Sequence, residues 1–421
     1  MSRYQQIVVV EALSSGTGLY VVEAALRKAE SVIFLTDDRD RYSADKSFDV
    51  LHKCEVLNDF PTHDSSAIAE FLRKRIRERG RAPVVLSLVD RVVEAVATAC
   101  ARVDVPFLPV EAVRQAQNKS AFRALCAEIG VPAPHSVDVW SSEDAVRAAR
   151  GISFPVVVKP ARGTGSYGVS ACYTPDDVPA AFARAWRDAE PCGVPVQVEE
   201  FAVGPLVSAE IVATDDMVHV LGVTGRVLSP YPHFVELSCI FPVGIGGCDG
   251  EAIRDSCERL ARGLAFSRGP AHVEFALTES GPKVIEFNPR LAGRNVGPMV
   301  AAALGWDLYE ALVDVAATGG CAVPPAPSRA GAERAIYASR SGMLRAVEGC
   351  EIARRVPGVQ EIRLTSRIGR TVSATGDQRG EIAITWAVGA TSDEARARAD
   401  AAATALHPVL EPEPDSTTAG N

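Results

Sequence analysis

The chain has 421 residues, of which 47% are hydrophobic and 23% are charged, and its formal net charge at pH 7 is -9. This composition is ordinary for a soluble globular protein, and the length suggests two to four domains. The negative net charge argues against a nucleic-acid-binding surface. The sequence also lacks a stripe of lysines and arginines with aromatic residues between them. No apolar run is long enough to cross a membrane, and the first residues lack a signal-peptide apolar segment, so we expect a cytoplasmic protein. The ten cysteines include no CxxC pair, which is typical of reduced cytosolic thiols.

The first part of the chain alternates predicted strands with predicted helices, which is typical of an open parallel α/β sheet. The loop Ser14–Gly18 (SSGTG) joins the first strand to the first helix, where an anion can bind at a helix N-terminus. It lacks both the GxGxxG and the GxxxxGK[ST] patterns, so helix packing is favoured there and a substrate contact stays open. The expected strands cover residues 7–10, 32–35, 84–88 and 105–108, and the expected helices cover residues 19–28, 67–79 and 92–101.

Two lysines occupy positions where their charge calls for a partner. Lys119 follows Asn118 at the start of a helix whose apolar residues repeat at helical spacing as far as Ile129. Lys159 lies near the end of an apolar strand at residues 154–160, where an unpaired charge would be costly. We therefore expect an anion or a carboxylate beside Lys159.

A glycine-rich loop follows Lys159 directly. Residues 161–169 (ARGTGSYGV) contain three glycines, a serine and a threonine, so backbone N–H groups are accessible without side-chain crowding. Such a loop can wrap phosphates. A plain hairpin turn is the alternative, but the lysine on the preceding strand favours phosphate binding.

After about residue 150 the predicted class changes from α/β to α+β. Strands at residues 196–201, 207–212 and 218–224 suggest an antiparallel sheet, and they carry Glu199, Glu200 and Glu210. The irregular segment that follows carries His233 and Glu236, polar side chains that can reach a substrate or can simply line a loop.

Residues 272–290 (HVEFALTESGPKVIEFNPR) predict two short strands around a tight turn. Side chains alternate faces along a strand, so Ile285 and Phe287 are expected to enter the core with the apolar residues of the first strand. The other face then gathers Glu274, Glu286 and Asn288. Two carboxylates and an amide oxygen are hard ligands that suit Mg²⁺. An ordinary hairpin with a solvated acidic face is the alternative.

The remaining sequence predicts a domain boundary at residues 319–328, which are rich in glycine and proline. Strands at residues 334–339, 359–364 and 381–388 and a helix at residues 392–406 follow. The predicted domains are an N-terminal α/β domain at 1–115, a central domain at 116–320 with a lid at about 133–200, a C-terminal mixed domain at 321–410, and a disordered tail at 411–421.

In chain order, these lysines, the glycine loop, the acidic strands and the EFNPR motif at 286–290 resemble the ATP-grasp superfamily of carboxylate–amine/thiol ligases. The resemblance covers about residues 118–294 closely and the whole chain more loosely. Residues 232–237 (PHFVEL) look like the L-amino acid ligase, dipeptide-forming branch. The resemblance implies an ATP-grasp fold, with an N-terminal open parallel α/β domain, a central two-subdomain ATP-grasp region and a C-terminal mixed β/α domain.

The resemblance also implies a role for each matching residue. ATP would be the co-substrate, with two Mg²⁺ ions bound and Mn²⁺ as an alternative. Glu274, Glu286 and Asn288 would hold the metal. Whether Glu199 or Glu200 contacts the adenine stays open. The nucleotide contacts would be Lys119, Lys159, Gly163, Thr164, Gly165, Ser166, Gly168, Glu199, Glu200, Phe201, Ala202 and Glu210.

Arg290 would stabilise the transferred phosphoryl group, since a guanidinium matches phosphate oxygens bidentately. Many relatives continue after this arginine with a run of glycines, whereas here Leu291-Ala292-Gly293-Arg294 follows. Arg294 would hold a substrate carboxylate or pair with an acidic neighbour. His233 and Glu236 would line the pocket for the amine substrate.

The implied activity is ligation of a carboxylate to an amine through an acyl phosphate, which gives an amide or dipeptide, ADP and phosphate. The expected partners are therefore small-molecule acids and amines, with no nucleic acid and no membrane, and homodimers are common in the families it resembles. The alternatives are a biotin-carboxylase-like or purine-biosynthetic ATP-grasp enzyme and a non-catalytic ATP-binding module. The absence of a biotin-attachment segment of the AMKM type argues against the first alternative.

Overall fold

The computed structural model describes residues 4–13, 18–43, 45, 47–374 and 378–412, so most of the SSGTG loop and most of the predicted disordered tail lie outside the described residues. The chain divides into two compact units. The first unit comprises residues 1–134, 202–224 and 244–327, and the second comprises residues 135–201, 225–243 and 328–421. No helix among the described residues is both long and apolar enough to cross a membrane.

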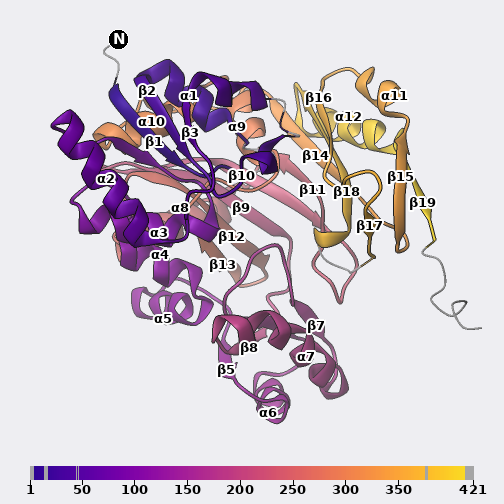
Figure 1. The fold of residues 1–421 in the computed structure, drawn as a ribbon. Coiled ribbons are helices and arrows are strands. Elements are labelled where there is room, and N and C mark those ends of the chain that lie inside the picture. Colours follow the sequence, from indigo (N-terminus) through magenta and orange to yellow (C-terminus); the bar gives the residue numbers. More distant parts are fainter. Residues whose placement is uncertain (1–3, 14–17, 44, 46, 375–377, 413–421) are drawn as a thin grey trace, which may run out of the picture. The chain divides into compact units, whose positions relative to one another are not determined.

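The first unit begins with a four-stranded parallel sheet in the order β3-β2-β1-β4. In β1, one of its two inner strands, Ile7–Val10 form a continuous buried apolar run, as expected for a parallel strand that is covered on both faces. Helices α2 and α3 pack on one face, and α1 packs on the other (Figure 1). The strands are β1 (Tyr4–Val10), β2 (Ala29–Leu35), β3 (Glu55–Leu57) and β4 (Val84–Leu86), and the helices are α1 (Tyr20–Lys28), α2 (Ser65–Arg79) and α3 (Asp90–Arg102).

The predicted strand at residues 105–108 is wrong. These residues pack Phe107 and Leu108 into the core without joining a sheet. Pro106 removes a backbone donor and Pro109 follows closely, so the segment is a poor member of a hydrogen-bonded ladder. Strand β3 was not predicted from the sequence, because it is too short to show a periodic pattern.

The first unit also holds an antiparallel sheet in the order β13-β12-β9-β10. Its strands are β9 (Leu206–Ala213), β10 (Val218–Leu228), β12 (Gly269–Thr278) and β13 (Gly281–Asn288), and β10 belongs to this unit as far as Thr224. The other helices of the unit are α4 (Val110–Gln117), α5 (Lys119–Ile129), α8 (Gly247–Gly263), α9 (Val296–Leu304) and α10 (Leu308–Thr318).

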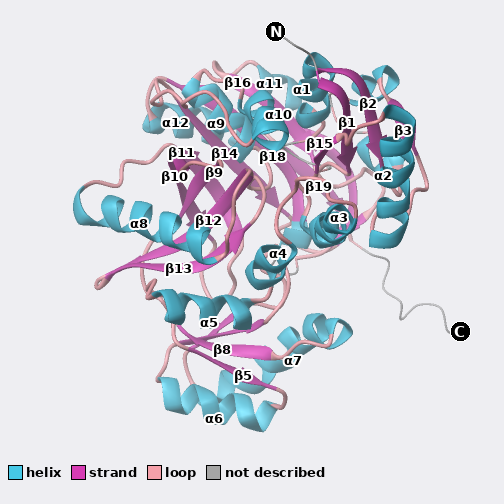
Figure 2. Cartoon of the chain, turned by 90° about the vertical axis from the view of Figure 1, so that its left-hand side faces the viewer, coloured by secondary structure: helices cyan, strands magenta, loops and turns pink. Residues whose placement is uncertain are grey.

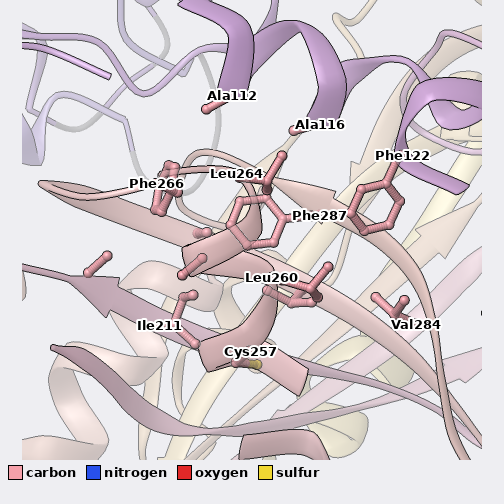
Figure 3. Packing of buried hydrophobic residues seen from close by; sticks show 14 of the residues in the cluster. Ala112, Ala116, Phe122, Ile211, Cys257, Leu260, Leu264, Phe266, Val284 and Phe287 are labelled. Carbon is pink, nitrogen blue, oxygen red and sulfur yellow. The ribbon is translucent and has the colours of Figure 1, made fainter. Parts of the chain in front are cut away.

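One apolar core joins this sheet to α4, α5 and α8. Figure 3 shows Phe287 of β13 between Phe122 of α5 and Phe266, whose ring centroid lies 5.2 Å from that of Phe287 in an edge-to-face arrangement. Ala112 and Ala116 of α4 face the same cluster. The close packing fixes the backbone of β13 on its apolar side, and the polar side of the strand is thereby oriented as well.

The second unit contains a small antiparallel sheet in the order β5-β8-β6-β7, and Figure 2 shows α6 beside it. Alanines of α6 and α7 pack with valines of β6 and β8 in a single core. The strands are β5 (Ser136–Val139), β6 (Val156–Pro160), β7 (Ser170–Cys172) and β8 (Val196–Glu200), and the helices are α6 (Ser142–Ile152) and α7 (Val178–Ala189).

The rest of the second unit is mixed β/α. Strands β11, β14, β18 and β16 lie side by side in that order, and α12 packs on them. The three short strands β17, β15 and β19 form a further sheet that the sequence did not suggest. The bounds are β11 (Glu236–Phe241), β14 (Ala330–Tyr337), β15 (Gly342–Glu348), α11 (Cys350–Arg354), β16 (Val359–Leu364), β17 (Thr371–Val372), β18 (Glu381–Gly389), α12 (Ser392–Thr404) and β19 (His407–Glu411).

Candidate active site

The β12–β13 hairpin brings the predicted metal ligands together. Glu274 lies directly opposite Glu286, and Asn288 lies opposite His272. On the other side of β12, His272 lies opposite Glu210 of β9. Cross-strand neighbours in an antiparallel pair have Cβ atoms about 4.5–5.5 Å apart, so these polar groups form one compact patch on the sheet.

One part of the predicted alternation is wrong, because the hairpin contains a β-bulge. The register shifts so that Phe275 pairs with Val284, and Ile285 is the extra residue on β13. Val284 and Phe287 therefore enter the core, whereas Ile285 is only half-buried. Arg123 of α5 donates a hydrogen bond to the Ile285 carbonyl at 2.8 Å, which fastens the bulge to the helix.

A buried network holds Glu210 and His272. The Ser208 and Thr224 hydroxyls donate to one carboxylate oxygen of Glu210 at 3.0 and 2.9 Å. His272 Nδ1 lies 2.9 Å from the other oxygen of Glu210, and His272 Nε2 lies 3.3 Å from Glu274. The imidazole thus links a fully buried carboxylate to a predicted metal ligand. His272 was not among the predicted site residues, since its partner Glu210 lies 62 residues away.

Lys119 contacts the same hairpin. Asn118 caps helix α5 by accepting from the backbone N–H groups of Ser120 and Ala121, which confirms the predicted helix start. The cap places Lys119 Nζ 2.9 Å from Glu286 Oε1. The Asn288 amide donates to the other oxygen of Glu286 at 3.3 Å. The Glu286 carboxylate is therefore oriented by a cation and an amide.

The two predicted catalytic arginines differ in their surroundings. Arg290 Nε lies 2.5 Å from Asp90 Oδ2, at the first residue of α3, and Arg290 Nη1 donates to the Leu291 carbonyl at 2.8 Å. Arg294 is buried and has a φ of 54°, a left-handed backbone that is uncommon for a residue other than glycine. Asp90 had not been singled out from the sequence, where it is one more carboxylate at a helix start.

In the second unit, Lys159 has the carboxylate partner that its position demanded. Its Nζ lies 2.7 Å from Glu199 Oε1, and both side chains are no more than 5% exposed. Strands β6 and β8 pair antiparallel here, so the two residues meet across the ladder. Glu200 faces the other way, and its side chain accepts from the His135 backbone N–H at 3.3 Å.

The glycine loop is the turn of the β6–β7 hairpin. Gly165 and Gly168 have φ values of 65° and 71°, where a side chain is strained. At Gly168 a Cβ atom would also lie 3.1 Å from the Ala185 backbone, so glycine is required there. The Arg379 guanidinium lies over the Tyr167 ring, with its Cζ atom 4.8 Å from the ring centroid, which is a packing role for this tyrosine.

Residues 229–235 form a closed loop that touches Phe201, one of the predicted nucleotide contacts. The Ser229 and Val235 backbones are joined by a 2.7 Å hydrogen bond at its base. Its tip packs Tyr231 and Phe234 on Phe201, with ring centroids 5.1 and 6.0 Å from that of Phe201. His233 of this loop is half-buried.

Glu236 is buried just beyond this loop, and Arg226 lies 3.0 Å from it. Glu236, Cys239 and Glu333 place one ligand atom each within 4.8 Å of the others, which is a metal-like spacing. The Arg226 guanidinium already supplies a positive charge to this cluster, so the spacing alone does not indicate an ion.

Comparison with known proteins agrees with the family that the order of motifs resembles. Residues 152–297 match the family model of the ATP-grasp domain, and residues 334–411 match that of the L-amino acid ligase C-terminal domain 2. The chain is 30% identical over 377 residues to the uncharacterized protein y4rH of Sinorhizobium fredii, which covers 88% of this chain and 76% of that protein. It is also 30% identical over 208 residues to the carbamoyl phosphate synthase large chain of Corynebacterium glutamicum. This match covers 49% of this chain and only 18% of that protein.

Solved structures show the same fold. The L-amino acid ligase from Bacillus licheniformis has a TM-score of 0.80 at 20% identity, covering 98% of this chain and 100% of that one. The biotin carboxylase domain of 2-oxoglutarate carboxylase from Hydrogenobacter thermophilus, in complex with MgADP, ADP and bicarbonate, has a TM-score of 0.72 at 16% identity, covering 97% and 92%. At such identities the likeness concerns the fold alone, and it confirms the predicted fold class.

Proposed function

Because the chain belongs to the ATP-grasp superfamily of carboxylate–amine ligases, we propose that it uses ATP to join an amino acid or similar small acid to an amine. The products are an amide or dipeptide, ADP and phosphate. The match of residues 334–411 to the L-amino acid ligase C-terminal domain 2 supports amino-acid substrates. The observation that carries the proposal is the polar patch of β12 and β13, where Glu274 faces Glu286 and Lys119 meets Glu286.

This patch fits a magnesium site by the chemistry of its donors. Glu274, Glu286 and Asn288 offer two carboxylates and an amide oxygen, which are hard ligands, and Mg²⁺ completes its shell with water and substrate phosphates. When bound, the ion neutralises charge on the triphosphate. Lys119 and the Asn288 amide orient the Glu286 carboxylate, so this chain's own residues set the direction of that ligand.

The nucleotide contacts are assigned by chemistry. Lys159 and the loop of residues 163–168 would bind phosphates, and residues 199–202 would bind adenine. Because Glu199 is engaged by Lys159, Glu200 is the better candidate for the base edge. Glu210 is among the predicted nucleotide contacts, but its oxygens already accept from Ser208, Thr224 and His272, which favours a role in orienting Glu274 through His272.

The reaction proceeds in two balanced steps. A carboxylate oxygen of the acid attacks the γ-phosphorus of ATP, the bond to the bridging oxygen breaks, and ADP leaves with its electron pair. The amine nitrogen then attacks the acyl carbon of the acyl phosphate, phosphate leaves, and the nitrogen loses a proton. Arg290 would bind the oxygens of the transferred phosphoryl group, where a fixed guanidinium stabilises charge as it develops. His233 and Glu236 are candidates for the amine pocket, and Arg294 is a candidate for a substrate carboxylate.

A carboxylase-like reaction is the second candidate, since the neighbour from Hydrogenobacter thermophilus was solved with MgADP and bicarbonate. A non-catalytic ATP-binding module is the third. It is disfavoured because such a module has no need of the Glu274, Glu286, Asn288 and Arg290 set.

Phosphate release from MgATP, measured with a panel of amino-acid pairs and with bicarbonate, tests the proposal. We expect release only when two particular amino acids are present, with a product whose mass equals their sum less one water. The folded Glu286→Gln variant should release much less phosphate at the same Mg²⁺ concentration and serves as the control. Release driven by bicarbonate alone supports the carboxylase reading, and nucleotide binding without turnover supports the binding module; either result refutes ligation.

A further inference from the structure

The Arg290 side chain is anchored by a single carboxylate from the parallel-sheet domain. Its Nε lies 2.5 Å from Asp90 Oδ2, and the two side chains are 13% and 20% exposed. Among the described residues, Asp90 is the only acidic partner of Arg290, and Arg290 is the only basic partner of Asp90. The pair is therefore a dedicated contact and is not a node of a wider charge network.

Asp90 itself is held firmly. It is the first residue of α3, which follows β4 after a short connection of residues 87–89, and Val92 and Val93 in the first turn of the helix are fully buried. The Gln117 side chain donates to the Asp90 carbonyl at 2.9 Å. Gln117 ends α4 and precedes the cap of α5 that orients Lys119. The backbone of Asp90 is thereby tied to the same segment that presents a predicted phosphate ligand.

These two contacts leave the second terminal nitrogen, Nη2, for other oxygens. Asp90 takes Nε, and the Leu291 carbonyl takes Nη1 at 2.8 Å. Nη2 of Arg290 has no hydrogen-bond partner among the described residues. Five donors in a planar fork allow this division, whereas an ammonium group has no comparable fixed edge.

We propose that Asp90 is a positioning residue, which fixes the plane of the Arg290 guanidinium so that Nη2 meets an oxygen of the transferred phosphoryl group. This inference rests on the proposed ligase reaction. A group that stabilises a transition state must be in place before the charge develops, and a misplacement of about 1 Å can cost about 10²-fold in rate. Asp90 acts only through Arg290 and need not touch the substrates.

The test uses the full chain, MgATP and the amino-acid pair that gives turnover. Asp90→Asn keeps the shape of the side chain but loses its charge, so kcat should fall by about 10- to 100-fold while KM for ATP changes by less than about threefold. Asp90→Glu restores the charge with one extra methylene and should recover part of the loss. In an Arg290→Lys background, Asp90→Asn should cost no more than about twofold, because the group it positions is gone.

Glu94→Gln is the matched control. Glu94 lies on the same helix and forms a comparable ion pair with Arg114 at 3.0 Å, but that pair is exposed and does not reach Arg290. Its kcat should equal that of the wild type. If Asp90→Asn keeps the wild-type kcat, or lowers kcat only in parallel with thermal stability, the inference is overturned while ligation stands. If the wild-type protein ligates nothing, the proposed function falls first and the inference falls with it.

Discussion

The buried Lys159–Glu199 pair gives a prediction whose size can be worked from the structure. The two groups lie 2.7 Å apart, and their side chains are 5% and 3% exposed. Removing one partner of a buried ion pair leaves a charge in a low-dielectric site, which costs about 3–5 kcal/mol. We therefore expect Glu199→Leu to lower the local opening free energy of β6 and β8 by about that amount.

Replacing both partners should behave differently. In the Lys159→Met/Glu199→Leu double variant no charge is buried, so stability should return to within about 1 kcal/mol of the wild type. The same variant should bind ATP weakly, because the proposed phosphate contact of Lys159 is lost. Stability and nucleotide affinity would thus separate in a single protein.

Hydrogen exchange read by mass spectrometry on peptides that cover β6 and β8 measures the local opening free energy. Arg147→Ala is the control, since Arg147 pairs with Asp144 at 3.0 Å on α6 but is 78% exposed, and exposed pairs contribute about 0–1 kcal/mol. If Glu199→Leu costs no more than this control, or if the double variant is as unstable as the single one, the reasoning about burial is refuted.

Three other outcomes can be measured. Phe287→Ala empties a fully buried position and should lower the free energy of unfolding by about 3–5 kcal/mol in urea titrations; a loss under about 1 kcal/mol would contradict the packing of that core. Glu286→Gln should raise the Mg²⁺ concentration needed for phosphate release more than about tenfold, and an unchanged requirement would place the metal elsewhere. Burial raises the pKa of Asp37, but the hydrogen bond from Arg41 and nearby positive charge outweigh it and lower the pKa from 3.8 to about 2. A depressed carboxyl pKa stabilises the folded state above pH 3.8, and this contribution is lost as pH falls through about 2, so the melting temperatures of Asp37→Asn and the wild type should converge over that window. If the difference in melting temperature between the two proteins grows as the pH falls, Asp37 does not stabilise the folded state in its charged form.

Several local features could be predicted from residue patterns. Asn118 caps its helix as expected, because a cap is a contact between residues two or three positions apart. The turn between β12 and β13 was recognised from Glu279 to Pro282, and the polar residues around it do gather on one face. The need of Lys159 for a carboxylate followed from burial alone, although its partner Glu199 could not be named.

Other features were not visible in the pattern. The bulge at Ile285 shifts the register of β13, and a period-two alternation contains no sign of an inserted residue. The sheet of β15, β17 and β19 joins short segments whose pairing depends on the rest of the fold.

The sequence by itself determined the chemistry on offer: hard oxygen ligands on one hairpin, a lysine that closes a buried strand, and an arginine that follows the second acidic strand. Only the tertiary structure decided which of these groups meet. Asp90 and Arg290 are 200 residues apart, and Glu210 and His272 are 62 apart. Caps, turns and strand faces arise from interactions within a few residues, so the local sequence encodes them. Partners at such separations are chosen by the packing of whole sheets and helices, which no local pattern contains.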